Sequence, residues 1–419
     1  MSLQPTHDPV GAPACALVDV DAIAANVRAL RDRSPGAALL AVVKADGYGH
    51  GLLPAARAAQ AGGATWLGTA QQSEALALRD AGVTITRIFT WLHVPGTDFG
   101  AALQRDIDVS ASGSWDLDAV AAAARTTGRT ARVHLKVDSG LGRNGAFGSD
   151  FVDLVSQGRR LEGEGLVSVV GVWSHFAYAD EPDHPTVRAQ REVFEAAVRT
   201  VEAAGCALEV RHLANSAATL TNPAVHYDLV RPGIAVYGLS PVPRLGGPEA
   251  YGLVPAMTLR AHLALVKRVP AGQGVSYGHA YSTPADTVLA LVPVGYADGI
   301  PRNATNVGPV SVDGRRNVVA GRVCMDQFVV DLGPDSQARA GDEVVLFGGD
   351  PSGPSAQDWA EATGTISYEI VTRIGPRVPR VLVGTAGREA GSTAGSTAGS
   401  TAPAPGVVAP GVVASGVVA

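Results

Sequence analysis

Residues 166–172 read LVSVVGV, an almost continuous apolar run. Parallel strands that helices cover on both faces are buried on both sides, so they lose the usual alternation of polar and apolar residues. Similar short runs, separated by amphipathic stretches, recur between about residues 12 and 240. The eight candidate strands are residues 38–44, 65–67, 87–90, 107–109, 132–137, 167–173, 208–212 and 229–236. Eight strands alternating with helices favour an α/β fold, a (β/α)8 TIM-type barrel, over an open sheet.

The first helix is the clearest, with Asp21 as its expected N-cap and Ile23, Val27 and Leu30 on one face. After about residue 241, Val- and Leu-rich segments are separated by Gly, Pro and Asp, which is typical of strands and turns. We therefore expect a barrel over residues 12–240 and a mainly β C-terminal domain over 241–386, with a short helix at 357–362. Residues 387–419 repeat GSTA and GVVA, which predicts a low-complexity disordered tail.

Composition excludes several classes of protein. The 419 residues carry a net charge of −6, and no basic block is present, so a nucleic-acid partner is not expected. No apolar run reaches membrane-spanning length, and residues 1–13 do not resemble a signal peptide. The three cysteines, Cys15, Cys206 and Cys324, are widely spaced, which fits a reducing cytoplasm. No metal-binding or nucleotide-hydrolysis motif occurs, so no catalytic metal is expected.

Polar residues stand where several of these apolar runs end. In a parallel barrel, chemistry takes place at the carboxyl ends of the strands. The residues at or just after these ends are Lys44, Lys136, Asp138, His175, Asn215, Ser216 and Arg231.

Lys44 lies in AVVKADGYGHG and is one of only three lysines among 33 basic residues. A lysine at such a site can form a Schiff base with an aldehyde cofactor such as pyridoxal phosphate. The amine must then be neutral, although its ordinary pKa is about 10.4. Burial and nearby arginines would lower that pKa. The alternative is a lysine that extends from a strand end to water, but the scarcity of lysine favours function.

Lys136 would repel Lys44 if both were charged, unless Asp138 pairs with it or its charge is lost. A phosphate group needs backbone N–H groups and hydroxyls. Asn215 and Ser216 at a helix start, with Gly233 and Ile234 after the last strand, could supply these at neighbouring barrel positions, although Asn or Ser at a helix start is also an ordinary cap.

The β domain contributes a group of tyrosines, Tyr277, Tyr281 and Tyr296, which are ordinarily half-buried strand residues. A tyrosine that acts as a base must have a pKa well below its usual value of about 10, which requires cationic neighbours.

Taken together, these motifs resemble the alanine racemase family, whose members use pyridoxal 5'-phosphate and combine a (β/α)8 barrel with a β domain. The resemblance covers about residues 15–383. It rests on AVVKADGYGHG, VHLKVDSGLGRNG, WSHFAYADE, HLANSAATL, LVRPGIAVYGL, GVSYGHAY, PVGYADG, GRVCMDQ and RVPRV. It implies a homodimer with the active site at the subunit interface, which interconverts L- and D-alanine and supplies D-alanine for peptidoglycan.

The resemblance also implies roles for single residues. Lys44 is similar to the cofactor-bound lysine that is the base on one face of the substrate, and Tyr277 to the base donated by the partner subunit. Arg231 resembles the residue facing the pyridine nitrogen, and His175 the link between Tyr277 and Arg231. Lys136 resembles a carbamylated lysine that braces Arg143, itself a substrate-binding residue. The remaining implied contacts are Tyr48, Asn215, Ser216, Gly233 and Ile234 for the cofactor, Met325, Asp326 and Tyr296 for the substrate, and Tyr296 and Arg302 for the access path.

Two positions depart from the family pattern. Asp46-Gly47 replace the more frequent Asn-Ala, and Pro376 stands where a phosphate-contacting tyrosine is expected before RVPR. Three alternatives remain open: a serine, lysine or broad-specificity racemase of this fold, a barrel-type decarboxylase, and a non-catalytic cofactor carrier. Arg231 opposes the decarboxylase because those enzymes place a carboxylate at the pyridine nitrogen, and the β domain opposes the carrier.

Overall fold

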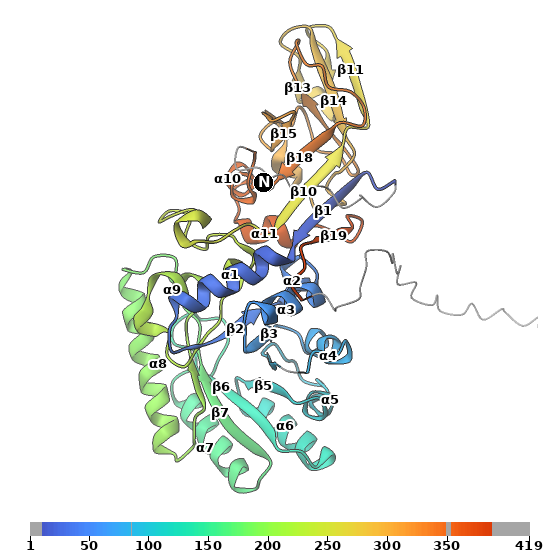
Figure 1. Ribbon diagram of the computed structural model, residues 1–419. Coiled ribbons are helices and arrows are strands. Elements are labelled where there is room, and N and C mark those ends of the chain that lie inside the picture. Colours follow the sequence, from blue (N-terminus) through green and yellow to red (C-terminus); the bar gives the residue numbers. More distant parts are fainter. Residues whose placement is uncertain (1–10, 85, 349–352, 388–419) are drawn as a thin grey trace, which may run out of the picture. The chain divides into compact units, whose positions relative to one another are not determined.

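The computed structural model describes residues 11–84, 86–348 and 353–387. The tail expected from residue 387 therefore lies, from 388 onward, outside the described residues. Within the described range the blue-to-green half of the chain alternates strands and helices, and the yellow-to-red half consists mainly of strands (Figure 1).

Eight parallel strands form the sheet of the first half, in the order β8-β7-β6-β5-β4-β3-β2-β9. Their bounds are β2 Ala38–Val42, β3 Trp66–Thr69, β4 Arg87–Thr90, β5 Ile107–Ala111, β6 Ala131–Lys136, β7 Val167–Trp173, β8 Val210–His212 and β9 Leu229–Val230. Backbone bonds from Asp228 N–H to Arg211 O (3.2 Å) and from Arg231 N–H to Ala214 O (2.9 Å) close the ring between β8 and β9. The expected (β/α)8 TIM-type barrel is confirmed.

Several strand ends differ from the sequence prediction, most of them by one or two residues, and two differences bear on the site. β2 stops at Val42, so Lys44 is the first residue of the short helix α2 (Lys44–Tyr48) instead of the end of a strand. The run 229–236 contains only the two-residue strand β9, followed by the 3-10 helix η2 (Ile234–Tyr237). Pro232 interrupts the run because it has no N–H to donate to a neighbouring strand.

Helix α1 precedes the first barrel strand, β2, and helices follow most of the barrel strands. They are α1 Val20–Arg33, α3 Leu52–Ala61, α4 Gln72–Asp80, α5 Phe99–Gln104, α6 Ser114–Thr127, α7 Ser149–Gly163, α8 Pro185–Ala203 and α9 Ser216–Thr221, with the 3-10 turn η1 Pro223–Val225. The predicted apolar face of α1 is confirmed, since Ile23, Val27 and Leu30 are completely buried. Its N-cap is Asp19, which accepts a bond from Ala22 N–H, and not Asp21. Among the described helices, none combines the length and apolarity that crossing a membrane requires.

A six-stranded sheet dominates the second half, in the order β16-β15-β18-β10-β1-β19. The strands are β1 Ala14–Asp19, β10 Met257–His262, β15 Pro309–Val312, β16 Arg315–Val318, β18 Glu343–Phe347 and β19 Arg380–Val383. β1 lies antiparallel to β10 and parallel to β19. The amino-terminal strand, which the sequence assigned to the barrel from residue 12, therefore belongs to the sheet of the β domain.

Smaller sheets and short helices complete the β domain. They are the sheet β11-β14-β17 (Leu265–Val269, Thr287–Val292, Phe328–Asp331), the hairpin β12-β13 (Gly274–Val275, Tyr281–Ser282), the helices α10 (Ala356–Thr363) and α11 (Ser367–Thr372), and the 3-10 turns η3 (Pro248–Tyr251), η4 (Tyr277–His279) and η5 (Arg302–Ala304). Helix α10 matches the short helix expected at 357–362.

Candidate active site

A left-handed turn after β2 carries Lys44. Residues 45–49 all have positive φ, from 52° to 81°, although only Gly47 and Gly49 lack a side chain that opposes this conformation. Buried His50 stabilises the turn, because its Nδ1 lies 3.0 Å from the carbonyl oxygens of both Gly47 and Tyr48. The turn reverses the chain at the barrel mouth and presents Lys44 and Tyr48 together.

Lys44 has the surroundings that a reactive amine requires. Its Nζ lies 5.9 Å from the ring centre of Trp91 and 6.0 Å from that of Tyr48. Burial, helped by the charge of Arg143, lowers the pKa of this amine from its ordinary value, while Glu74 opposes the shift. A larger fraction of the amine is therefore neutral and able to attack a carbonyl carbon.

An anion cradle lies beside it, formed by Tyr48, Ser216 and Gly233. The Ser216 Oγ accepts bonds from the N–H of Gly233 (2.7 Å) and of Ala235 (3.4 Å). A Cβ on Gly233 would lie 2.2 Å from the Tyr48 hydroxyl, so only glycine permits this approach. The hydroxyls of Tyr48 and Ser216 thus converge beside Gly233, and since Ser216 Oγ accepts from the backbone, its own O–H is free to donate to an anion such as a phosphate group. Ile234 is completely buried behind the cradle.

Asn215 takes the capping role that its type suggests. Its side chain accepts from Ala218 N–H at 3.1 Å and starts α9, which places Ser216 at the first helical position. The bridge between Asn215 and Arg231 ties this helix start to the end of β9. Asn215 therefore orients the cradle through the backbone.

Arg231 is 5% exposed and stands at the floor of the mouth. Its Nη2 donates to the carbonyls of Ser174 (2.7 Å) and Leu213 (3.2 Å) and lies 3.4 Å from the Nδ1 of His175. Burial lowers the pKa of the guanidinium to about 9, which still leaves it protonated at neutral pH. Burial and the charge of Arg231 hold the pKa of His175 well below its usual value, so this imidazole is neutral.

Lys136 ends β6 and is only 3% exposed. Its Nζ lies 4.1 Å from the ring centre of Trp173. Burial first, and then the charges of Arg231 and Arg143, lower the pKa of this amine to about 7, with Asp138 opposing. Asp138 does not form the pair considered from the sequence, since its Oδ1 accepts from the N–H groups of residues 140, 141 and 142 and shapes the loop that carries exposed Arg143.

Tyr368 lies beside Tyr48, a neighbour that the sequence alone does not reveal. It lies on α11, and its ring centre is 6.3 Å from that of Tyr48. Burial raises the pKa of its hydroxyl, which keeps it a hydrogen-bond donor. Tyr368 lies in the segment SYEIV, eight residues before Pro376, so a buried tyrosine ring lies next to Tyr48 although position 376 itself is a proline.

The remaining predicted residues form a second group in the β domain. Tyr277 is 73% exposed, Met325 53% and Tyr296 41%. Their loops meet at Cys324, whose Sγ lies 3.4 Å from Ser276 Oγ and whose carbonyl accepts from Tyr296 N–H at 3.0 Å. The other two predicted residues are Asp326, which pairs with Arg377 at 2.8 Å, and Arg302, which begins η5.

The backbone before Tyr277 is unusual. Ser276 has φ 61° and ψ −173°, a conformation that glycine adopts readily and serine rarely. Its Oγ donates to Arg322 O at 2.8 Å and fixes the turn. Within the described part of the chain, no hydrogen bond joins Tyr277 or Met325 to Lys44 or Arg231. The predicted site is therefore divided into a barrel half and a β-domain half.

A TIM-type barrel with a reactive lysine and an anion cradle at the carboxyl ends of its strands, joined to a β domain, defines a class of two-domain barrel enzymes. Comparison with known proteins gives the family. The family model described as "Alanine racemase, N-terminal domain" matches residues 18–241, and "Alanine racemase, C-terminal domain" matches 256–382. The chain belongs to the alanine racemase family.

Individual relatives agree. The chain is 59% identical over 382 residues to alanine racemase of Frankia casuarinae, covering 90% of this chain and 99% of the relative. It is 59% identical over 371 residues to that of Streptomyces coelicolor, covering 87% and 95%. The crystal structure of alanine racemase from Streptomyces lavendulae superimposes with a TM-score of 0.88 at 58% identity, covering 90% and 98%. The activity is the interconversion of L- and D-alanine.

Proposed function

We propose that pyridoxal 5'-phosphate is the cofactor and that Lys44 holds it covalently. The single observation that carries this is the convergence of the buried Lys44 amine and the cradle of Tyr48, Ser216 and Gly233. When bound, the cofactor supplies an electron sink that makes the α-proton of an amino acid removable. Tyr368 and the backbone N–H of Ile234 would complete the contacts to the phosphate.

Arg231 would face the pyridine nitrogen. A guanidinium donates hydrogen bonds and does not readily release its proton, so this nitrogen would stay unprotonated. That limits how much charge the ring can accept, and it restrains competing transamination and decarboxylation. Arg231 is well suited to this role because its orientation is fixed by the carbonyls of Ser174 and Leu213.

Racemisation needs one base on each face of the substrate, because the proton leaves one face and returns to the other. We infer that Lys44 serves one face and Tyr277 of the partner subunit serves the other. The high exposure of Tyr277, and its lack of hydrogen bonds to the barrel half within the described chain, support a homodimer whose interface completes each site.

His175 would link the two halves. The His175 Nδ1 lies 3.4 Å from Arg231 Nη2, and because arginine only donates, we infer that this Nδ1 carries no proton and that the proton of the neutral ring is on Nε2. That N–H is then available to donate to the partner subunit's Tyr277 and to stabilise its phenolate. Met325 and Asp326 would contact the substrate carboxylate together with Arg143, and Tyr296 and Arg302 would line the access path.

Lys136 would carry a carbamate. Its neutral amine attacks carbon dioxide, the new N–C bond forms as one C–O π bond opens, and one proton leaves to solvent, which converts the neutral amine into an anionic carbamate. The anion would brace Arg143 and would remove the charge repulsion among Lys44, Lys136, Arg143 and Arg231. The pKa of about 7 makes the neutral amine available for this reaction.

We further propose that the protein acts in the cytoplasm and supplies D-alanine for peptidoglycan. The test of substrate class is a panel of single L-amino acids incubated with purified protein and resolved by chiral chromatography. We expect turnover confined to alanine; comparable turnover of serine or lysine would make the enzyme a broader racemase.

The cofactor assignment is tested by Lys44→Ala, with Lys267→Ala on β11 as the matched control. We expect Lys44→Ala to lose both racemisation and the visible absorbance of the lysine-bound cofactor, while Lys267→Ala keeps both. Retained racemisation in Lys44→Ala would overturn the role of this lysine.

A further inference from the structure

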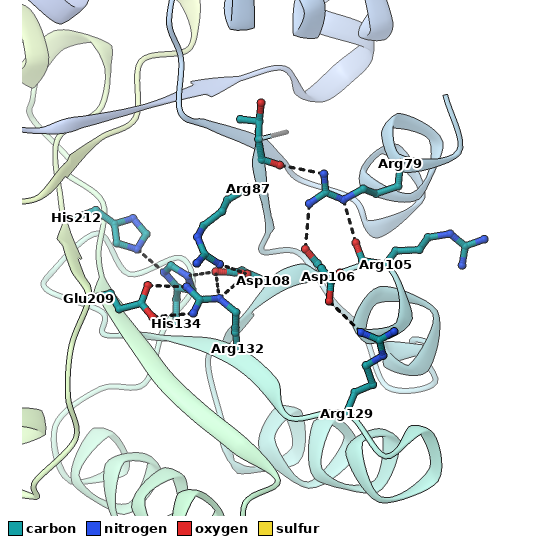
Figure 2. Close-up of polar contacts among 11 residues, drawn as sticks. Arg79, Arg87, Arg105, Asp106, Asp108, Arg129, Arg132, His134, Glu209 and His212 are labelled. Carbon is teal, nitrogen blue, oxygen red and sulfur yellow. Dashed lines mark hydrogen bonds and ion pairs between the residues drawn. The ribbon is translucent and has the colours of Figure 1, made fainter. Parts of the chain in front are cut away.

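A continuous line of buried hydrogen bonds runs from Arg231 down through the barrel to Asp108 on β5. Arg231 Nη1 lies 3.3 Å from His212 Nδ1, His212 Nε2 lies 2.9 Å from His134 Nδ1, and His134 Nε2 lies 3.2 Å from Asp108 Oδ2. Figure 2 shows the lower part, from His212 to Asp108. Each of the four side chains is at most 5% exposed. We call this line the Arg231–Asp108 relay.

The chemistry of the two ends dictates where the protons lie. Arginine only donates, so His212 Nδ1 accepts, and in a neutral imidazole the proton is then on Nε2. That N–H donates to His134 Nδ1, so His134 also carries its proton on Nε2 and donates it to the carboxylate of Asp108. Burial lowers the pKa of both imidazoles, in agreement with neutral rings. Every bond in the relay therefore points the same way.

Packing prevents the two rings from turning to another arrangement. The Trp173 ring stacks on His212 with 6° between their planes, and Phe89 lies 4.5 Å from His134, centre to centre. A Cβ on Gly171 would lie 2.3 Å from His134 Nδ1, so the ring occupies space that only a glycine leaves open.

The far end is an ionic cluster at the bottom of the barrel (Figure 2). Arg132 Nε lies 3.1 Å from both oxygens of Asp108, and its two terminal nitrogens bind Glu209 at 2.7 and 2.8 Å. Arg87 adds a second guanidinium at 3.9 Å. Two cations and two carboxylates fix Asp108 so that one of its oxygens faces His134.

Arg231 itself has no carboxylate partner among the described residues. A buried cation without one is costly unless oriented dipoles compensate for its lost hydration. Aligned hydrogen bonds polarise one another, so a line that ends on an anion offers Arg231 more than a single neutral imidazole does.

We propose that His212, His134 and Asp108 are positioning residues for racemisation, which hold the Arg231 guanidinium protonated and in one orientation toward the pyridine nitrogen. The proposal rests on the function proposed for Arg231 above. It assigns a task to three residues that lie beneath the active site and touch neither substrate nor cofactor.

The first test reads the protons directly. Protein labelled with 15N-histidine is examined by two-bond 1H–15N correlation spectra, in the cofactor-loaded and cofactor-free forms, with His134→Gln and His212→Gln to assign the signals. We expect both rings to be neutral with the proton on Nε2 in both forms. A proton on Nδ1 of either ring, or a doubly protonated ring, would overturn the relay, whether or not the proposed function holds.

The second test separates positioning from stability. His212→Gln is compared with His226→Gln, a buried histidine outside the relay that contacts Thr219 O at 3.0 Å. Per cofactor-loaded site, we expect His212→Gln to lower kcat roughly tenfold while KM for alanine changes less than about twofold. The absorbance maximum of the bound cofactor should also shift, and His226→Gln should change neither quantity.

Asp108→Asn keeps an acceptor for His134 and removes the charge. If the two Nε2 protons are preserved and kcat falls, the negative charge of Asp108 contributes to positioning Arg231. If neither the Nε2 protons nor kcat change, the role proposed for Asp108 is refuted. If His212→Gln only lowers the unfolding temperature and leaves kcat and absorbance unchanged, the positioning role is refuted. If a variant does not fold, the proton positions on His134 and His212 of the wild-type protein still test the relay. A wild-type protein that binds no pyridoxal phosphate would refute the proposed function without touching the proton pattern.

Discussion

Substitution of one glycine in the anion cradle tests whether the geometry of this site governs cofactor binding. In Gly233→Ala the new methyl carbon would lie 2.2 Å from the Tyr48 hydroxyl and 2.9 Å from its Cζ, closer than unbonded atoms approach. Tyr48 cannot simply turn away, because it is buried, with Tyr237 at 5.0 Å and Tyr368 at 6.3 Å between ring centres. The hydroxyl must therefore leave the cradle or the backbone at residue 233 must shift.

The magnitude follows from the two consequences. Overpacking of a dense site costs about 1–3 kcal/mol. Loss of a hydrogen bond to a charged group costs about 1.5–3 kcal/mol, which corresponds to a rise in Kd of roughly 10- to 150-fold. Because strain affects the free protein as well, we expect a 10- to 100-fold weaker affinity for pyridoxal phosphate together with a modest loss of thermal stability.

The assay is titration of the cofactor-free protein with pyridoxal phosphate, followed by absorbance and protein fluorescence. Gly163→Ala is the matched control, because a Cβ there would meet nothing within 4 Å and the backbone φ is not positive. Tyr48→Phe and the double variant Gly233→Ala/Tyr48→Phe complete a cycle. We expect the double variant to bind about as weakly as Tyr48→Phe alone, since both changes remove the same hydroxyl. The proposal that the cradle binds the cofactor would be refuted if Gly233→Ala bound pyridoxal phosphate as tightly as the wild type. It would also be refuted if the losses of binding free energy in the two single variants added up in the double variant.

Three further predictions address the bases, the carbamate and the stability of the barrel. Tyr277→Phe should slow exchange of the α-proton of L-alanine more than that of D-alanine, as measured with deuterated substrates in water; equal slowing would contradict the assignment of one base to each face. Protein equilibrated with 13C-bicarbonate should give one carbamate carbon signal that is absent in Lys136→Met, and persistence of the signal in that variant would assign it elsewhere. Burial raises the pKa of Asp116 to about 6. The native state therefore binds more protons than the unfolded state between pH 3.8 and about 6, so the free energy of unfolding of the wild type should fall as the pH rises through this window, relative to that of Asp116→Asn. Free energies of unfolding measured in denaturant at several pH values check this, and identical pH dependence in the two proteins would refute it.

Much of the barrel could be predicted from local patterns. β4 and β7 have the bounds expected from their apolar runs, because strands buried on both faces leave a continuous apolar signal. The ends of β2 and β9 do not follow from this signal. Pro232 and the left-handed turn after Val43 depend on backbone geometry that a count of apolar residues does not reveal.

The pairing of β1 could not be foreseen. Ala16 lies opposite Leu259 on one side and Arg380 on the other, so both partners are more than 240 residues away in the chain. A short apolar segment next to a predicted barrel is expected, from local pattern alone, to belong to that barrel. Hydrophobic pattern fixes which residues are buried, but not the distant strand against which they are buried.

The site residues divide in the same way. Lys136 at the end of β6, Arg231 directly after β9 and Lys44 two residues beyond β2 could be proposed as site residues, because the barrel fold gives these positions a meaning. The relay was missed, although RVHLK at 132–136 placed Arg132, His134 and Lys136 at every second position and hence on one face of β6. Tyr368 was missed because its contact with Tyr48 joins α11 to a loop about 320 residues earlier, and nothing local to either segment announces it.

The position of β1 between β10 and β19 has a consequence for how the protein is made. A ribosome adds roughly 5–20 residues per second, so the 239 residues that separate Val18 from Met257 take on the order of 10–50 s to appear. That interval is long enough for a barrel to form, whereas β1 has no β10 to pair with and its backbone N–H and C=O groups stay without strand partners. A fragment begun at residue 241 would lack this strand and leave β19 without its neighbour. The β domain is thus contiguous in space but not in sequence, and during biosynthesis it is the last part to be completed.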